Sequence, residues 1–149
     1  MTGVQTCALP IYDKISEALA LSQIGMDYIS FGNSIKGLEY RLKSIEVAEK
    51  SNNLEMLGDS KLHLGLYFYE QKEYERAIEF GLSGNETAIK AKNEIMQTWA
   101  FWLLGDSYYG LNKLDTALMY AQRAYDICFL IYPEFCPTTH RSNRYNQNS

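Results

Sequence analysis

Three residues near the C-terminus carry side chains that can bind a metal ion, namely Cys128, Cys136 and His140. Thiolate and imidazole groups are the ligands that zinc prefers. The spacing C-x7-C-x3-H matches no familiar zinc site, however, and prolines lie between the three residues. We therefore expect no metal site, and we interpret Cys128 as a small buried apolar side chain.

The other histidine, His63, follows Asp59 by one turn of a predicted helix. No nucleophile accompanies it, so we expect an exposed or hydrogen-bonded surface residue. The charged run EQKEYERAIE, residues 70 to 79, suits a turn and a helix start, where acidic side chains favour the helix dipole. The sequence contains no glycine-rich phosphate loop, H-E-x-x-H or G-x-S-x-G. These observations predict a non-enzyme without catalytic residues, cofactor or metal.

Composition and charge narrow the function classes further. The 149 residues are 46% hydrophobic and 13% aromatic, with 3 prolines, which is typical of one globular domain. A net charge of −4 gives no basic surface for nucleic acid. Apolar runs such as ICFLIY, residues 127 to 132, are far shorter than the roughly 18 residues that cross a membrane. Three cysteines without a C-x-x-C motif indicate a reduced, cytoplasmic chain.

The first eleven residues, MTGVQTCALPI, differ from the rest of the chain because they show no helical period. They resemble a peptide produced when sequencing-adaptor nucleotides are translated as coding sequence in environmental gene predictions. A native disordered arm is the alternative. We therefore assign residues 1–12 to a non-native or disordered leader and expect a fragment of a metagenomic protein.

The rest of the chain repeats with a period of 40 residues. Five positions agree in three copies, and they place a glycine, an aromatic, a small residue, a second aromatic and a second small residue at the same spacings: Gly25, Gly65, Gly105; Tyr28, Phe68, Tyr108; Gly37, Ala77, Ala117; Tyr40, Phe80, Tyr120; Ser44, Gly84, Ala124. Repeats of this length are typical of stacked supersecondary units, none of which buries its apolar face alone.

Apolar residues within each unit follow the helical spacing i, i+3, i+4. Polar or glycine-containing breaks separate the helical stretches, at residues 31–34, 51–53, 71–73, 91–93 and 110–113. This pattern predicts six helices in three antiparallel hairpins, which is an all-α solenoid. Asp13, Asn53 and Asn93 also recur every 40 residues, and we expect each to cap a first helix.

The repeated glycines explain how the hairpins close. A glycine inside a helix costs roughly 1 kcal/mol relative to alanine. We expect Gly25, Gly65 and Gly105 to face the small residues twelve positions later, so that close helix packing offsets this cost.

The segment LGLYFYEQKEYERAIEF, residues 64 to 80, resembles the tetratricopeptide repeat (TPR) at Leu64, Gly65, Phe68, Tyr74 and Ala77. Residues 103 to 124 match nearly as well, and the copy that begins at Ile24 is weaker. The resemblance covers residues 13–132, in units of about 13–52, 53–92 and 93–132. Residues 133–149 are expected to form an irregular tail or a broken fourth repeat.

Two features depart from the usual TPR pattern. The period is 40 rather than the usual length of about 34 residues, and the proline that normally ends each unit is missing. Longer repeats of this kind resemble the TPR arrays of bacterial signalling proteins, which precede histidine kinase or DNA-binding domains. That likeness implies a sensory or regulatory segment whose output domain is absent here, and whose groove holds a small signalling peptide.

By analogy with the family, the first helix of each unit lines an inner groove that binds a protein or peptide segment. The expected groove positions lie six and three residues before each glycine and one and four after it. These positions include Leu19 and Ser22, and our partner-binding candidates are the other ten: Met26, Ile29, Asp59, Leu62, Leu66, Tyr69, Trp99, Trp102, Asp106 and Tyr109. The alternative for Trp99 and Trp102 is simple packing against neighbouring helices. The apolar last helix also suggests self-association.

Overall fold

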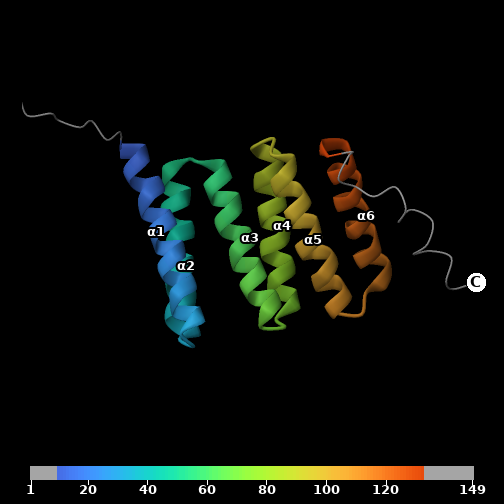
Figure 1. The fold of residues 1–149 in the computed structure, drawn as a ribbon, viewed down its shortest axis with the longest axis horizontal. Coiled ribbons are helices and arrows are strands. Elements are labelled where there is room, and N and C mark those ends of the chain that lie inside the picture. Colours follow the sequence, from blue (N-terminus) through green and yellow to red (C-terminus); the bar gives the residue numbers. More distant parts are fainter. Residues whose placement is uncertain (1–9, 133–149) are drawn as a thin grey trace, which may run out of the picture.

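The computed structural model describes residues 10–132, and side chains from Lys14 onward. Six helices account for nearly all of this region: α1 (Pro10–Ser30), α2 (Ser34–Ser51), α3 (Leu54–Glu70), α4 (Tyr74–Lys90), α5 (Glu94–Gly110) and α6 (Leu114–Ile131). They form three antiparallel hairpins in a row (Figure 1). The predicted all-α solenoid is confirmed. The expected leader, apart from its helical residues 10–12, and the expected tail lie outside the described residues.

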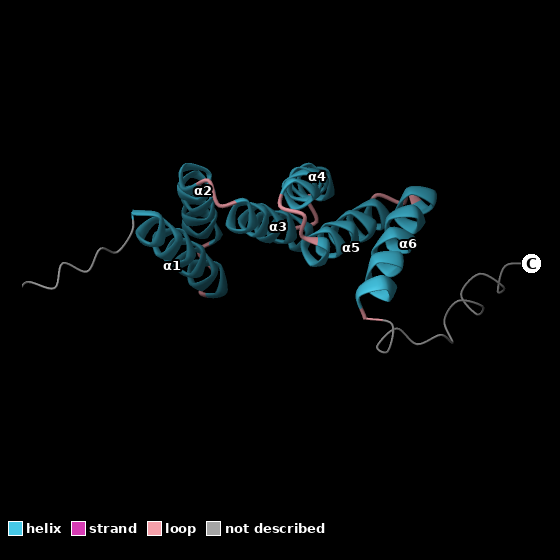
Figure 2. Cartoon of the chain, turned by 90° about the horizontal axis from the view of Figure 1, so that it is seen from above, coloured by secondary structure: helices cyan, strands magenta, loops and turns pink. Residues whose placement is uncertain are grey.

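The first helices of the three hairpins share one side of the row. Figure 2 shows α1, α3 and α5 on one side of the row, with α2 and α4 on the other. Each hairpin packs as a unit, and α4 also packs against α5, so that Phe68 and Leu64 are fully enclosed. None of the described helices is long and apolar enough to cross a membrane.

The repeated glycines do face the small residues of the partner helix. A Cβ atom on Gly65 would lie 3.4 Å from the carbonyl oxygen of Ala77, and one on Gly105 would lie 3.4 Å from that of Ala117. The side chain of Leu103 occupies the space beside Gly65, where a Cβ atom would lie only 2.6 Å from it. Close backbone approach therefore closes each hairpin, as the spacing predicts.

The two repeated aromatics of each unit stack on one another. The ring centroids are 5.4 Å apart for Tyr28 and Tyr40, 5.5 Å apart for Phe68 and Phe80, and 5.5 Å apart for Tyr108 and Tyr120. Such offset pairs add about 0.5–1.5 kcal/mol to the burial of the rings. The sequence period of 40 residues thus records a physical contact that each hairpin repeats.

Side-chain caps begin three of the helices. The carboxamide oxygen of Asn53 accepts a hydrogen bond from the backbone N–H of Met56 at 3.0 Å, and that of Asn93 accepts one from Met96 at 2.9 Å. Both caps were expected, and Asn33 caps α2 in the same way. The expected cap at Asp13 is wrong, because α1 begins at Pro10 and Asp13 lies inside it. Proline suits a first helical position, since its fixed φ is already helical and no N–H is lost.

One interface residue breaks the repeat. Arg41 occupies the position of Gly81 in the second unit, where the missing side chain leaves room for Leu104 of α5. Arg41 is only 8% exposed, and its Nε atom has no hydrogen-bond partner within the described residues. The first and second units therefore meet around a buried guanidinium group, and the second and third around a leucine.

Candidate functional site

The structure forms a hollow of about 220 Å³ between α3 and α5. We call it the α3–α5 groove and define it by the nine residues that line it: Asp59, Leu62, His63, Leu66, Tyr69, Trp99, Trp102, Leu103 and Asp106. Seven of these nine are among the ten candidates taken from the sequence. All nine lie on α3 or α5, the first helices of their units. On each helix they recur every three or four residues, so they share one face.

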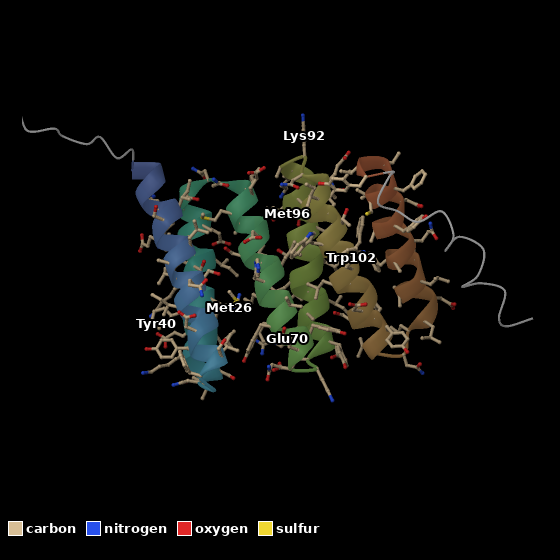
Figure 3. The ribbon with its side chains drawn as sticks, viewed as in Figure 1. Met26, Tyr40, Glu70, Lys92, Met96 and Trp102 are labelled. Atoms are coloured by element: carbon tan, nitrogen blue, oxygen red, sulfur yellow. The ribbon has the colours of Figure 1, made fainter. Side chains whose placement is uncertain are left out.

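Two tryptophans form the α5 wall of the groove. Trp99 is 56% exposed and Trp102 is 54% exposed, although both are large aromatic side chains. They stand one turn apart on α5, and Figure 3 shows Trp102 on this helix. Packing against neighbouring helices leaves more than half of each surface uncovered. An exposed aromatic pair beside a hollow is the composition typical of interaction hot spots.

A carboxylate and an imidazole lie on the α3 wall. The Nδ1 atom of His63 is 2.9 Å from the backbone carbonyl oxygen of Asp59 and 3.2 Å from its carboxylate Oδ2. The hydrogen bond to Asp59 raises the pKa of His63, while burial and the charge of Arg41 oppose the rise. His63 is thus the hydrogen-bonded residue that the sequence suggested. Its place in the groove was not predicted.

A second carboxylate, that of Asp106, lies on the α5 side of the groove. Burial raises the pKa of this carboxyl group, which means that the groove disfavours its charged form. Burial together with the negative charge of Asp106 also raises the pKa of the Tyr69 hydroxyl. A nearby positive charge favours the ionised form, so a cation that enters the groove stabilises the carboxylate of Asp106.

The groove continues along the two helices into a second hollow of about 270 Å³. The two hollows share Asp59, Leu62, His63 and Trp99, and the second adds Asn93, Ile95 and Met96 near the start of α5. The combined depression therefore runs parallel to α3 and α5. Along α3 it reaches at least from Asp59 to Tyr69, or about 15 Å at the helical rise of 1.5 Å per residue.

Three of the ten candidates lie away from this hollow. Ile29 packs its side chain on Gly37, and Met26 is on α1, with α3 between it and Trp102 (Figure 3). Tyr109 is 69% exposed, whereas Tyr69, at the same repeat position, lines the groove. Tyr69 lines the groove because α5 lies beside α3. Within the described residues no further first helix follows α5, so Tyr109 has no such helix to face.

Two groove residues were missed, His63 and Leu103. Both stand two residues before a repeated glycine, so one rule of position finds both.

Among the metal candidates, Cys128 is half-buried on α6 rather than fully buried. Cys136 and His140 lie outside the described residues. The last helix does expose several apolar side chains, as its composition suggested: Leu114, Leu118, Met119, Phe129 and Leu130.

A comparison of folds identifies the architecture. The N-terminal domain of stress-induced protein-1 (STI-1) from C. elegans superposes with a TM-score of 0.66 over 76% of this chain and 86% of that chain, at 16% identity. The chain is a tetratricopeptide-like helical repeat. No protein-family model matches it.

A curated relative supports the same conclusion for this TPR-like repeat. Response regulator aspartate phosphatase I of Bacillus subtilis (strain 168) is 29% identical over 102 residues. The match covers 64% of this chain but only 26% of the relative, so the repeat spans about a quarter of that protein's length. The resemblance expected from the sequence is confirmed at the level of the fold.

Proposed function

We propose that this TPR-like repeat is a non-catalytic scaffold that binds a peptide segment of a partner protein in the α3–α5 groove. The observation that carries the proposal is the exposed pair Trp99 and Trp102, set beside a hollow with apolar walls. Large aromatic side chains lose little conformational entropy on binding and bury much area, which is why they dominate binding energies.

The charges of the groove favour a basic or neutral segment over an acidic one. Asp59 and Asp106 contribute two carboxylates, and none of the nine lining residues is Lys or Arg. A Lys or Arg side chain of the partner pairs with one of these carboxylates and lies against the face of Trp99 or Trp102, where a cation interacts favourably with an aromatic ring. Leu62 and Leu66 then contact an apolar neighbour of that side chain.

The length of the groove suits a short extended segment. About 15 Å of α3 lines it, and an extended chain advances about 3.3 Å per residue, so four or five residues fill it. A segment of this length presents its side chains alternately to α3 and α5. Backbone groups of the bound segment stay open to water along the outer side.

The second candidate function is a sensory or regulatory segment of a bacterial signalling protein. The observation in its favour is the match to response regulator aspartate phosphatase I. In that case the bound segment is a small signalling peptide, and occupation of the groove controls a further domain. The native gene distinguishes the two functions, because a downstream kinase or DNA-binding domain favours regulation and further repeats alone favour a scaffold.

The direct test is selection of binding peptides from a displayed random library on the immobilised protein. We expect enrichment of short segments that contain Lys or Arg next to an apolar residue. The Trp102→Ala variant is then expected to lose binding by more than tenfold, since hot-spot tryptophans contribute about 2 kcal/mol or more. Its helicity, measured by circular dichroism, stays unchanged because Trp102 is largely outside the core.

Phe31→Ala is the matched control. Phe31 is an aromatic residue that is 89% exposed, and it lies in the turn between α1 and α2, outside the groove. This variant should bind the selected peptides as the wild type does. Equal loss of binding in both variants, or enrichment of acidic peptides, would contradict the proposal.

A further inference from the structure

His63 lies in the groove and contacts Asp59, one of the two carboxylates that line it. Its Nδ1 atom lies within hydrogen-bond distance of two acceptors, the backbone oxygen and the carboxylate Oδ2 of Asp59. A carbonyl and a carboxylate oxygen can only accept, so Nδ1 carries a proton in both charge states of the ring. The atom that gains or loses a proton is therefore Nε2.

This arrangement gives the groove two states of charge. With a neutral imidazole, Asp59 and Asp106 together contribute two negative charges. With a protonated imidazole, the same contacts become an ion pair between His63 and Asp59, and one negative charge is cancelled. The side chain of His63 is about one-third exposed, so the solvent can exchange the proton without unfolding the site.

We infer that His63 is a specificity-determining residue: when neutral it leaves the carboxylate of Asp59 to a cationic side chain of the bound segment, and when protonated it pairs with Asp59 and repels that cation. The inference rests on the proposed function of the groove. It predicts that a Lys- or Arg-containing segment binds at mildly basic pH, where His63 is neutral, and binds more weakly as the pH falls and His63 gains its proton. A segment with an apolar side chain in place of the Lys or Arg is expected to bind at both pH values.

The charged groups around His63 come from three helices. Asp59 lies on its own helix α3, Arg41 approaches from α2, and Asp106 stands across the groove on α5. Arg41 disfavours protonation of His63, while Asp59 favours it. The hydrogen bond to Asp59 is the strongest of these influences, so the pKa of His63 is raised above the ordinary value for histidine.

The test is a titration with one Lys- or Arg-containing peptide selected on the protein and with its norleucine counterpart, at about pH 8 and about pH 5.5. The chain has two tryptophans, and both line the groove, so their fluorescence reports binding there. We expect the cationic peptide to bind about fivefold to tenfold more weakly at the lower pH, because charges a few ångströms apart in a partly buried site interact strongly. The norleucine peptide should change much less.

His63→Gln is the decisive variant, since glutamine keeps a hydrogen-bond donor near Asp59 and has no charge to gain. In this variant the cationic peptide should bind equally at both pH values. If the pH dependence persists in the variant, Asp106 or another group titrates and the role of His63 is overturned. If neither peptide binds at either pH, the proposed function itself fails, and the role of His63 fails with it.

Nuclear magnetic resonance supplies a readout that a merely structural role would not change. Binding and protonation are reciprocal, so the bound cationic peptide must raise the acid dissociation constant of His63 by the factor by which its protonation weakens binding, and the pKa falls by the logarithm of that factor. The His63→Gln spectrum identifies the signal, because the chain has two histidines. An unchanged His63 titration in the presence of saturating cationic peptide would overturn the inference.

Discussion

Gly25 and Gly37 approach each other so closely that neither position has room for a side chain. A Cβ atom on Gly25 would lie 2.9 Å from the carbonyl oxygen of Gly37, and one on Gly37 would lie 2.7 Å from that of Gly25. The first hairpin is thus closed backbone to backbone. The third hairpin is less tight, because a Cβ atom on Gly105 would lie 3.4 Å from the nearest atom.

The same substitution should therefore have opposite effects at two equivalent positions. Gly25→Ala is expected to lower the free energy of unfolding by about 1–3 kcal/mol, because the backbone of α2 must move away. Gly105→Ala should raise it by about 0.5–1 kcal/mol, since alanine favours the helix and its methyl group fits. Urea denaturation of both variants measures the difference. Destabilisation of similar size at both sites would contradict it.

A larger side chain at Gly105 should not fit. Atoms beyond Cβ meet the backbones of Ala117 and Ala121, which lie within about 3.5 Å of the Cβ position. We expect Gly105→Leu to lower stability by a few kcal/mol through overpacking. Thermal unfolding followed by circular dichroism measures this loss. An unchanged melting temperature would contradict close helix packing as the reason for a glycine at this position.

Lys72, at the turn between α3 and α4, has a left-handed backbone with φ of 62°. Residues other than glycine are strained in that region by about 1 kcal/mol. Lys72→Gly is therefore expected to raise the free energy of unfolding by about 0.5–1 kcal/mol. Lys36→Gly is the control, because Lys36 lies inside α2, where glycine relieves no strain and costs about 1 kcal/mol. Equal effects of the two substitutions in urea denaturation would be inconsistent with this explanation.

Asp106→Asn should separate binding from stability. Burial raises the pKa of Asp106 in the folded chain, so its contribution to stability is most favourable below its ordinary pKa of 3.8 and is lost as the pH rises through the raised value. At neutral pH the variant is therefore expected to be slightly more stable than the wild type, with the gain vanishing below about pH 4. Binding of a cationic peptide should weaken. Thermal unfolding at both pH values and a binding titration measure the two effects.

The helices could be predicted from the sequence because their signals are local and repeat three times. Glycine, aromatic and small residues recur at positions that meet inside one hairpin, and Asn53 and Asn93 mark helix starts by their own side chains. The start of α1 could not be placed correctly. Pro10 fits a first helical turn, but no repeated feature marks it.

The groove could be predicted only in part, because it depends on how neighbouring units are spaced. The positions taken from the TPR resemblance include seven of the nine residues that line the hollow. They do not show that the hollow forms between α3 and α5 and leaves Met26 of α1 outside. The burial of Arg41 between the first two units could not be predicted from the repeat either, since the equivalent positions carry Gly81 and Ala121.

The emission of the two tryptophans during titration with a selected cationic peptide shows whether a segment enters the α3–α5 groove. Trp99 and Trp102 both line the groove and are about half exposed, so a segment that enters must displace water from them. We predict a saturable blue shift that Trp102→Ala removes and Phe31→Ala preserves. Calorimetric binding of the same peptide without any change in tryptophan emission would place its site elsewhere and contradict the account.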